Sequence, residues 1–281
     1  MAVAGYAVMR FAMVCLWLRA AQQDGPRRGT AVRYAIGITI VQLLWIARLW
    51  IHDGTLTTTT YFVFMACELA VPVWAERRRP TPYHPHHIAE RYSLFTIIVL
   101  GEVVLAIVQA IQGVMEEGHF SADLVMLIVG ALLIIFSIWW MYFKREHVDI
   151  VESSELPMLF GYGHLIIFAA VAGIGAALAA GVDVAQHVAH VQALPIAIAL
   201  SVGVALYLLT LGIIHVVGGH EPMRELLPAV VVSVACLGIG FSPLPIGAST
   251  LLIGVVLALA AGHAVHSNLR RAQLAEPAVA H

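Results

Sequence analysis

Apolar residues form nine long runs along the chain, and short polar connectors of a few to about 15 residues separate them. The runs cover approximately residues 2–20, 31–52, 57–76, 88–112, 122–143, 157–180, 194–216, 225–241 and 247–267. Each is close to the ~20 residues that an α-helix needs to cross the hydrocarbon core of a bilayer. The pattern predicts an all-α fold, a polytopic transmembrane helical bundle of about nine spans, with residues 1–281 as a single domain.

Composition narrows the protein class in the same direction. Hydrophobic residues make up 60% of the 281 residues and charged residues 11%, whereas a soluble globular domain carries about 25% charged residues. Lipid must therefore cover most of the surface. The net charge of −2, with basic residues dispersed over the connectors, offers no basic face for nucleic acid. The three cysteines all lie in apolar runs without zinc-site spacing, so we expect neither a disulfide framework nor a zinc site.

The basic residues predict an orientation for the bundle. If the first run passes from outside to inside, every Lys and Arg except Arg10 and Arg48 falls in an inner connector or the inner tail. Such an excess of Lys and Arg is typical of the cytoplasmic side of a membrane protein. We therefore predict an amino terminus outside and a carboxyl terminus inside.

Four ionisable residues lie within predicted spans: Arg10 in the first, Glu68 in the third, Glu102 in the fourth and His164 in the sixth. A charge near the bilayer centre costs at least about 2.5–3.5 kcal/mol, so each of these groups needs a partner or a function. Counting about 1.5 Å per residue places Arg10 and Glu102 at similar depths and Glu68 about 4–5 Å further in. This predicts an Arg10–Glu102 contact with Glu68 as a second acceptor. His164 is expected to be either a proton relay or a hydrogen-bonded packing residue.

The fourth run carries a polar stripe. At about 100° per residue, Glu102 lies within about 20° of both Arg91 and Gln109, and these three residues form one stripe with Ile98, whereas Glu90 lies about 120° from Glu102. A polar stripe along a whole span has to face protein or water. It indicates either the lining of an ion path, proton path or substrate cavity, or a helix whose buried carboxylate is neutralised by a neighbouring arginine.

Two connectors carry further candidate ligands. His84, His86 and His87 lie close together before the fourth run and are weak candidates for binding a metal, but a solvated loop explains them equally because no Cys or inner-face carboxylate completes a set. The acidic group Glu116, Glu117, His119 and Asp123 follows the fourth run and indicates either cation attraction or an ordinary solvated loop. We expect no resident cofactor. A retinal protein is excluded because the one lysine, Lys144, lies outside the spans.

The fourth run also resembles a known family signature. The stretch His87-x-x-Glu90-Arg91-Tyr92-x-Leu94-Phe95-Thr96-Ile97-Ile98-x-Leu100-Gly101-Glu102 is similar to that of the bacterial low temperature requirement A (LtrA) family. Weaker similarities are Met9-Arg10-Phe11 with Leu16-Trp17-Leu18-Arg19, Tyr142 to Lys144, and Tyr162-Gly163-His164-Leu165. The resemblance covers essentially the whole chain and implies a bacterial cytoplasmic membrane. Family members usually begin with further spans bearing a Glu-Leu-Phe-Phe-Asp-Leu type motif, so we expect either a shortened variant or a start assigned late.

These observations favour a secondary transporter or an ion- or proton-conducting protein. The residues expected to line its path or to form a buried ion-pair network are Arg10, Glu68, Glu90, Arg91, Glu102, Gln109 and His164. Expected partners are the lipid bilayer and a small ion or proton, with no nucleic acid. One alternative is a membrane enzyme or a haem- or metal-binding protein that uses the inner-face histidines, although the sequence carries no nucleophile elbow, phosphate loop or paired-aspartate span. Another is a non-catalytic membrane component.

Overall fold

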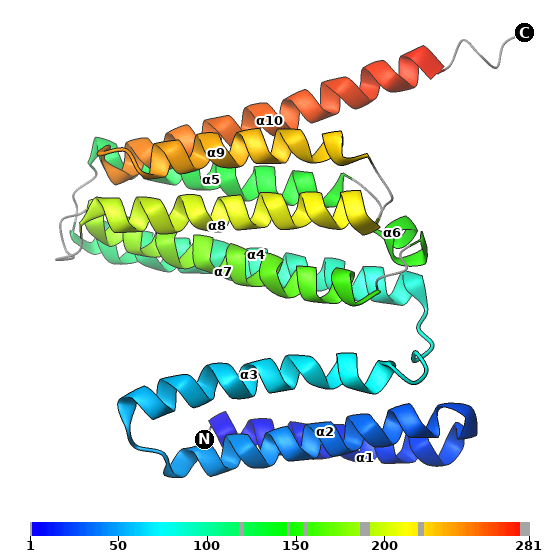
Figure 1. Ribbon diagram of the computed structural model, residues 1–281. Coiled ribbons are helices and arrows are strands. Elements are labelled where there is room, and N and C mark those ends of the chain that lie inside the picture. Colours follow the sequence, from blue (N-terminus) through cyan, green and yellow to red (C-terminus); the bar gives the residue numbers. More distant parts are fainter. Residues whose placement is uncertain are drawn as a thin grey trace, which may run out of the picture. The chain divides into compact units, whose positions relative to one another are not determined.

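A computed structural model of the chain describes residues 2–117, 121–144, 147–153, 157–185, 192–218 and 222–275. Within those ranges the fold is all-helical (Figure 1). The long helices are α1 (Ala2–Gln23), α2 (Arg28–Ala47), α3 (Gly54–Glu76), α4 (Pro85–Glu117), α5 (Ala122–Phe143), α7 (Pro157–Ala185), α8 (Ala193–Ile213), α9 (Leu227–Gly240) and α10 (Ile246–Ala275). The short elements are α6 (Val148–Ser153), the π-helical η3 (Ile214–Gly218) that extends α8, and the 3₁₀ turns η1 (Gly25–Arg27), η2 (Arg48–Trp50) and η4 (Met223–Leu226).

Nine helical segments of the described ranges are long and apolar enough to cross a membrane, which confirms the predicted fold class and places the chain in a lipid bilayer. The helices extend past the apolar runs in several places. The fourth begins at Pro85, where its fixed φ suits a first helical turn, and continues to Glu117. Hydropathy marks the part of a helix that lies in hydrocarbon, not the point where its hydrogen bonds end. The orientation of the spans stays a prediction.

The chain divides into two compact units, residues 1–83 and 84–281, and the prediction of a single domain stays a prediction. In the first unit α2 packs against both α1 and α3. The largest buried apolar cluster of this unit is small: Ile38, Val41 and Val71 are its buried members. Gly37 permits the contact, since a Cβ atom there would lie 2.7 Å from a methyl group of Val71.

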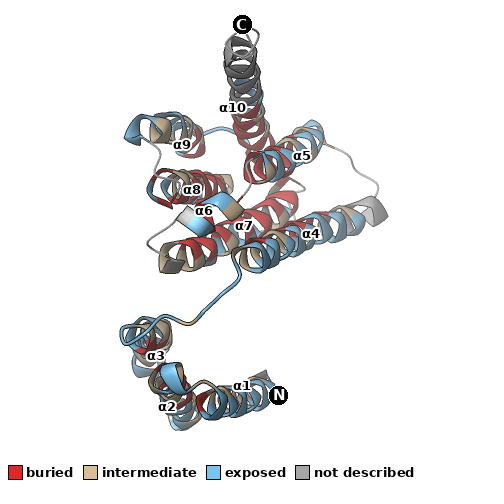
Figure 2. Cartoon of the chain, turned by 90° about the vertical axis from the view of Figure 1, so that its right-hand side faces the viewer, coloured by how far each residue is buried: buried red, intermediate tan, exposed pale blue. Residues whose placement is uncertain are grey.

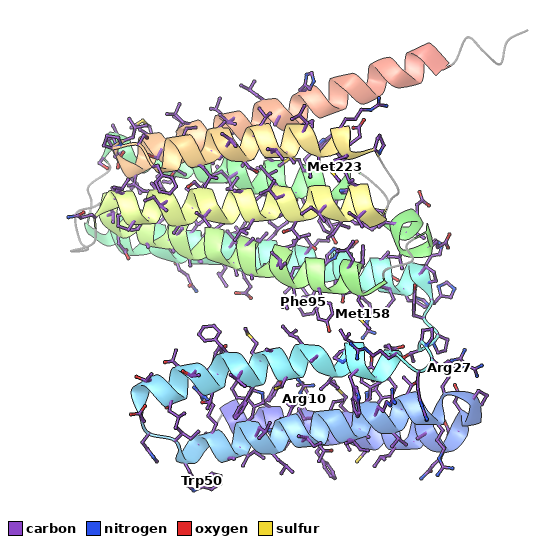
Figure 3. All side chains as sticks on the ribbon, in the orientation of Figure 1. Arg10, Arg27, Trp50, Phe95, Met158 and Met223 are labelled. Atoms are coloured by element: carbon purple, nitrogen blue, oxygen red, sulfur yellow. The ribbon has the colours of Figure 1, made fainter. Side chains whose placement is uncertain are left out.

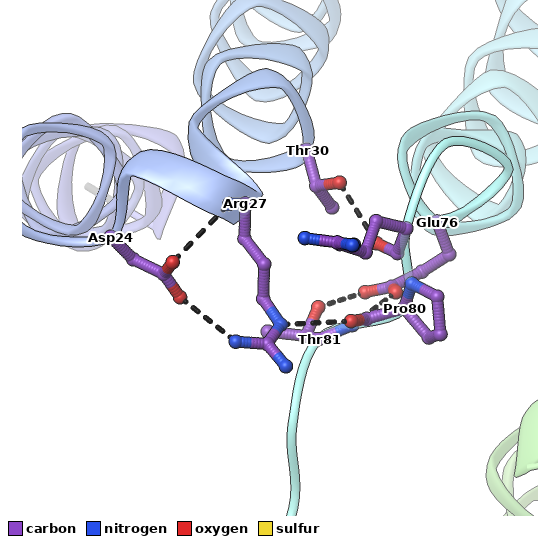
Figure 4. Close-up of polar contacts among 7 residues, drawn as sticks. Asp24, Arg27, Thr30, Glu76, Pro80 and Thr81 are labelled. Atoms are coloured by element: carbon purple, nitrogen blue, oxygen red, sulfur yellow. Dashed lines mark hydrogen bonds and ion pairs between the residues drawn. The ribbon is translucent and has the colours of Figure 1, made fainter.

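Polar contacts hold the ends of these three helices together (Figure 4). Arg27 pairs with Asp24 at 3.3 Å and donates from Nε to the Pro80 carbonyl at 3.3 Å. Thr30 donates to the Arg79 carbonyl at 2.8 Å, so the α1–α2 turn is tied to the segment that follows α3. These contacts fix the main chain at the end of the unit where α1 ends, α2 begins and α3 ends.

The second unit has a much larger apolar core. Its closest helix pairs are α5 with α10, α7 with α8, α8 with α9, and α4 with α7. Figure 2 shows that the buried faces of these helices turn toward one another. Leu124, Ile134, Ile174 and Leu200 are among the fully buried side chains, whereas Phe136, at 65% exposed, is one of the large apolar residues on the outside. Lipid is the medium that suits such an outer surface.

Glycines set the close crossing of α5 and α10. A Cβ atom on Gly130 would lie 2.5 Å from the Leu251 nitrogen, and one on Gly254 would lie 2.7 Å from the Gly130 oxygen. Small residues let membrane helices approach in this way because lipid supplies no hydrophobic drive for association. Asp123 accepts a hydrogen bond from the Gly247 N–H at 3.0 Å and so caps the first turn of α10 from the neighbouring helix. Asp123 is the described member of the predicted acidic group; His119 and the side chains of Glu116 and Glu117 lie outside the described residues.

Candidate functional site

A partly buried ion pair joins α1 and α3 in the first unit: Arg10 contacts Glu68, and their side chains are 17% and 23% exposed. Tyr6 lies between them, accepting from Arg10 and donating to Glu68. Trp45 of α2 donates from Nε1 to the second Glu68 oxygen at 3.1 Å. The Arg10 side chain can be seen within the first unit in Figure 3. Glu68 of α3 therefore receives donors from both other helices of the unit, α1 and α2, which answers the need of an intramembrane carboxylate for partners.

Local sequence positions these groups. Tyr6 and Arg10 are four residues apart, which places them on the same face of α1. Pro72 lies inside α3, four residues after Glu68. Because proline has no N–H, the carbonyl of Glu68 cannot receive its usual helical hydrogen bond, and the helix is weakened at this point. The charged side chain thus comes from the turn of α3 where backbone bonding is incomplete.

A cavity of about 190 Å³ lies beside the ion pair. Its lining is largely aromatic and aliphatic and consists of Arg10, Met13, Trp17, Tyr34, Ile38, Val41, Gln42, Trp45, Glu68, Val71 and Pro72. Trp17 and Tyr34 stack on its wall with ring centroids 4.1 Å apart and planes 7° apart. Both polar atoms of the Gln42 side-chain amide are buried without a hydrogen-bond partner among the described residues. An unsatisfied buried polar group of this kind costs about 1–3 kcal/mol, and the two amide atoms present almost no accessible surface to the cavity.

The predicted stripe on α4 lies away from the core of its own unit. Arg91, Ile98, Glu102 and Gln109 are all exposed. The opposite face of α4 is buried and consists of Ala89, Thr96, Leu100, Val103 and Ile107. This confirms the helical geometry of the stripe but not its role. The Arg10–Glu102 contact joins residues of different units and stays a prediction; the partner that the structure gives to Arg10 is Glu68.

The three histidines that precede and open α4 are exposed. The His84 ring lies 5.9 Å from His86 and 4.9 Å from His87, centroid to centroid. His87 Nδ1 is 3.8 Å from a Glu90 oxygen, and both side chains are more than half exposed. Among the described residues, no three His, Cys, Asp or Glu side chains converge to hold a metal ion. Metal binding by these histidines stays a prediction.

His164 lies in the core of the second unit and is hydrogen-bonded at both nitrogens. Nδ1 is 2.7 Å from the Phe160 carbonyl and Nε2 is 2.9 Å from the Tyr142 hydroxyl. A carbonyl only accepts, so Nδ1 carries the proton and donates it, and Nε2 accepts from Tyr142. His164 thus has a hydrogen-bond partner at each nitrogen, and both alternatives, packing residue and proton relay, stay predictions.

Two further histidines lie near His164 and were missed by the sequence analysis. The His147 ring is 6.1 Å from His164 and 5.8 Å from His215, and it stacks on Tyr142 at 4.4 Å. His147 follows α5 outside the spans yet is 4% exposed. Burial, with a smaller effect of the His215 and His164 rings, lowers the pKa of His147 from 6.5 to about 3. Its position in a connector made it indistinguishable from a solvated histidine in the sequence.

A sequence model of the family described as "Bacterial low temperature requirement A protein (LtrA)" matches residues 1–261. The "Uncharacterized protein RA0937" of Rhizobium meliloti (strain 1021) is 31% identical over 142 residues, which is 46% of this chain and 32% of that relative. The chain therefore aligns with about a third of the length of this relative. No solved structure gave a significant match. The family resemblance seen in the fourth run is confirmed.

Proposed function

Since the chain belongs to the bacterial low temperature requirement A (LtrA) family and is a multi-pass membrane protein, we propose that it is a secondary transporter or an ion- or proton-conducting protein. We place it in the bacterial cytoplasmic membrane, with the amino terminus outside and the carboxyl terminus inside. The observation that carries the proposal is the Arg10–Glu68 ion pair beside a cavity within the first unit.

The contacts of the ion pair favour a working site over a purely structural one. A structural pair in a membrane helix bundle is best stabilised when packing closes over it, because unsatisfied polar groups are costly in hydrocarbon. Here the pair borders a cavity, and the Gln42 amide on that cavity has no partner among the described residues. Ionisable residues at membrane depth that border a cavity are typical of a substrate or ion path.

The residues proposed to take part are Arg10 and Glu68 of the first unit and, in the second unit, Glu90, Arg91, Glu102, Gln109 and His164. The exposure of the stripe outside its own unit's core supports this role, since a polar stripe must face protein or water.

Flux measurements test the proposal. The full chain is reconstituted in proteoliposomes, and proton, Na⁺ and K⁺ movement is followed under a pH gradient and under a membrane potential. We expect flux above empty vesicles for the wild type, and a loss of about tenfold or more in Glu68→Gln, because a neutral amide cannot balance Arg10. Glu102→Gln is expected to lower flux as well. Glu152→Gln removes an exposed carboxylate of α6 and is the matched control, which should leave flux unchanged.

Folded yield and melting temperature are measured for each variant, so that a loss of flux is not confused with a loss of structure. If folded wild-type protein moves none of these ions above the empty vesicles, ion or proton conduction is wrong. If it conducts and neither Glu68→Gln nor Glu102→Gln changes the rate, conduction stands and the proposed path is wrong.

A further inference from the structure

We infer that the end of the first unit where α1 ends, α2 begins and α3 ends binds the phosphodiester headgroup of an anionic phospholipid. Five exposed arginines form this surface, and we call them the arginine cluster: Arg19, Arg28, Arg77, Arg78 and Arg79. None of them lines the cavity beside the ion pair. The inference therefore does not rest on the proposed transport function.

The fold brings two connectors together at this end. Thr30 donates to the Arg79 carbonyl at 2.8 Å, and Arg27 donates to the Pro80 carbonyl at 3.3 Å, so the start of α2 is tied to the segment after α3 (Figure 4). Nη1 of Arg78 lies 3.1 Å from the position that a Cβ atom of Gly29 would occupy, so this side chain reaches the first turn of α2. Arg78 therefore lies close to the neighbour of Gly29, Arg28.

This end carries more positive charge than its own carboxylates balance. Residues 19–33 and 74–83 contain seven arginines and two carboxylates, which is a net charge of +5. Both carboxylates are engaged, since Asp24 pairs with Arg27 and Glu76 accepts from Tyr34 at 2.9 Å and from Thr81. Among the described residues, no Asp or Glu forms a salt bridge with the arginine cluster. Such a surplus of positive charge attracts an anion.

The cluster lies at the level of the lipid headgroups. One candidate span ends at Glu76, directly before Arg77. Leu18 and Trp74, which are 47% and 41% exposed, offer apolar surface to acyl chains within a few residues of the cluster. The Arg33 guanidinium lies 5.3 Å from the centre of the Trp74 ring and adds a positive charge at the same depth. Several arginines directly beside a span are typical of binding to anionic lipid, so the lipid is the source of phosphate that the position favours.

Membrane insertion alone does not explain the arrangement. An excess of arginine on one side orients the spans, but it does not require that arginines from two connectors converge. In the second unit, Arg91 and Arg224 each have a carboxylate next to them in the sequence, Glu90 and Glu225. In the first unit, the three consecutive arginines 77–79 follow a single carboxylate that is already hydrogen-bonded.

The chemistry of the guanidinium group selects the headgroup. Arginine binds phosphate oxygens through two parallel N–H bonds and stays charged at every physiological pH. A phosphatidylglycerol headgroup has one negative charge and no positive one. Phosphatidylcholine has the same phosphodiester but adds a quaternary ammonium group, which the surplus positive charge of the cluster repels. We therefore expect binding that depends on the net charge of the headgroup.

Lipid titration of the purified full-length protein in a neutral detergent tests the inference. Phosphatidylglycerol and phosphatidylcholine with identical acyl chains are compared by native mass spectrometry, which gives the dissociation constant of the first lipid bound, and independently by the shift in melting temperature. We expect phosphatidylglycerol to bind about tenfold or more tightly. Its stabilising effect should fall as NaCl is raised, because salt screens exposed charges. Glycerol 1-phosphate supplies the phosphate without acyl chains and should not reproduce the stabilisation.

Substitutions assign the binding to the cluster. Arg28→Gln and Arg78→Gln should each weaken phosphatidylglycerol binding about fivefold and leave phosphatidylcholine binding unchanged. Arg28→Lys keeps the charge and should retain most of the affinity. Arg224→Gln makes the same chemical change at an exposed position of η4 in the second unit and should have no effect. Melting temperatures without added lipid show whether each variant is folded.

Several outcomes would overturn the inference. Equal affinity for the two lipids would refute the charge argument. Equal losses in Arg224→Gln and Arg28→Gln would mean that lipid responds to overall charge and that the cluster is no site. If glycerol 1-phosphate binds as tightly as phosphatidylglycerol, the surface takes free phosphate and its assignment to lipid is wrong. A loss in Arg28→Gln that Arg28→Lys shows equally would mean that packing, not charge, is what the substitution disturbs.

Discussion

The substitution Gly130→Ala should loosen the tightest helix crossing of the second unit. A Cβ atom at this position would lie 2.5 Å from the Leu251 nitrogen and the Thr250 carbonyl carbon and 2.6 Å from the Thr250 oxygen. All three are main-chain atoms of α10, so no side chain can rotate away. Normal contact needs about 3.5 Å or more, so α5 and α10 must separate by about 1 Å along the crossing.

The cost follows from two opposing effects. Overpacking of this kind costs about 1–3 kcal/mol, and main-chain neighbours put Gly130 at the upper end. Alanine returns up to about 1 kcal/mol because it forms helix better than glycine. We therefore expect a net loss of about 2 kcal/mol in the free energy of unfolding, which corresponds to roughly 4–8 °C in melting temperature for a chain of this size.

Thermal unfolding of the detergent-purified protein measures the effect, and Gly173→Ala is the matched control. Gly173 also lies inside a membrane helix, α7, but a Cβ atom there meets nothing within 4 Å. This variant should melt at the wild-type temperature or slightly above it. Gly254→Ala should destabilise the protein as Gly130→Ala does. The double variant should lose less stability than the sum of the two single losses, because both substitutions force apart the same crossing of α5 and α10. If Gly130→Ala has the same melting temperature as Gly173→Ala, the crossing is not as close as described and the reasoning is refuted.

Three other predictions concern single polar side chains. The imidazole of His147, with its pKa lowered to about 3, stays neutral in the folded protein but takes up a proton in the unfolded chain as the pH falls below 6.5. Acidification from pH 7.5 to pH 5 should therefore lower the free energy of unfolding by about 2 kcal/mol. In melts recorded over this pH range, His147→Asn should reduce the pH dependence, whereas His84→Asn, at an exposed position, should leave it as steep as in the wild type. Tyr207→Phe removes a hydrogen bond of 2.8 Å to the Ile138 carbonyl in the core and should lower the free energy of unfolding by about 1–2 kcal/mol; an unchanged melting temperature would contradict this. Asp123→Ala should lower the free energy of unfolding by about 1 kcal/mol because the cap of α10 is lost, whereas Asp123→Asn should keep most of the wild-type stability in the same melting assay. Equal effects of the two substitutions would argue against a hydrogen-bonded cap.

The spans were predictable because the bilayer imposes a length on each apolar run. The sequence predicted that Arg10 has a carboxylate partner, but it ranked Glu68 second. Counting residues favoured Glu102 over Glu68 by a few Å of depth, but the arginine side chain is long enough to cover such a difference. The contact of Arg10 with Glu68 depends on which helices pack together, and α1 and α3 both pack on α2; the contact with Glu102 stays a prediction. Helix adjacency is a tertiary property that residue spacing does not contain.

Gln42 and His147 show a second limit of sequence reasoning. A neutral amide in a span costs far less to insert than a charge, so Gln42 did not stand out beside Glu68 although both line one cavity. His147 is buried because the segment after α5 brings it against Tyr142, His164 and His215, which belong to three other elements. Neither the unsatisfied amide nor the buried connector histidine leaves a periodic signal along the chain.

The two units differ in the contacts that stabilise each one internally. The second unit buries a continuous apolar core from α4 to α10, and its central polar group, His164, is hydrogen-bonded at both nitrogens. In the first unit the largest apolar cluster has Ile38, Val41 and Val71 as its buried members, and α3 is weakened at Pro72. Regions with few buried apolar contacts open at lower free energy than the core of a protein. The ion pair, the Trp17–Tyr34 stack and the end contacts of Arg27 therefore carry a larger share of the first unit's stability.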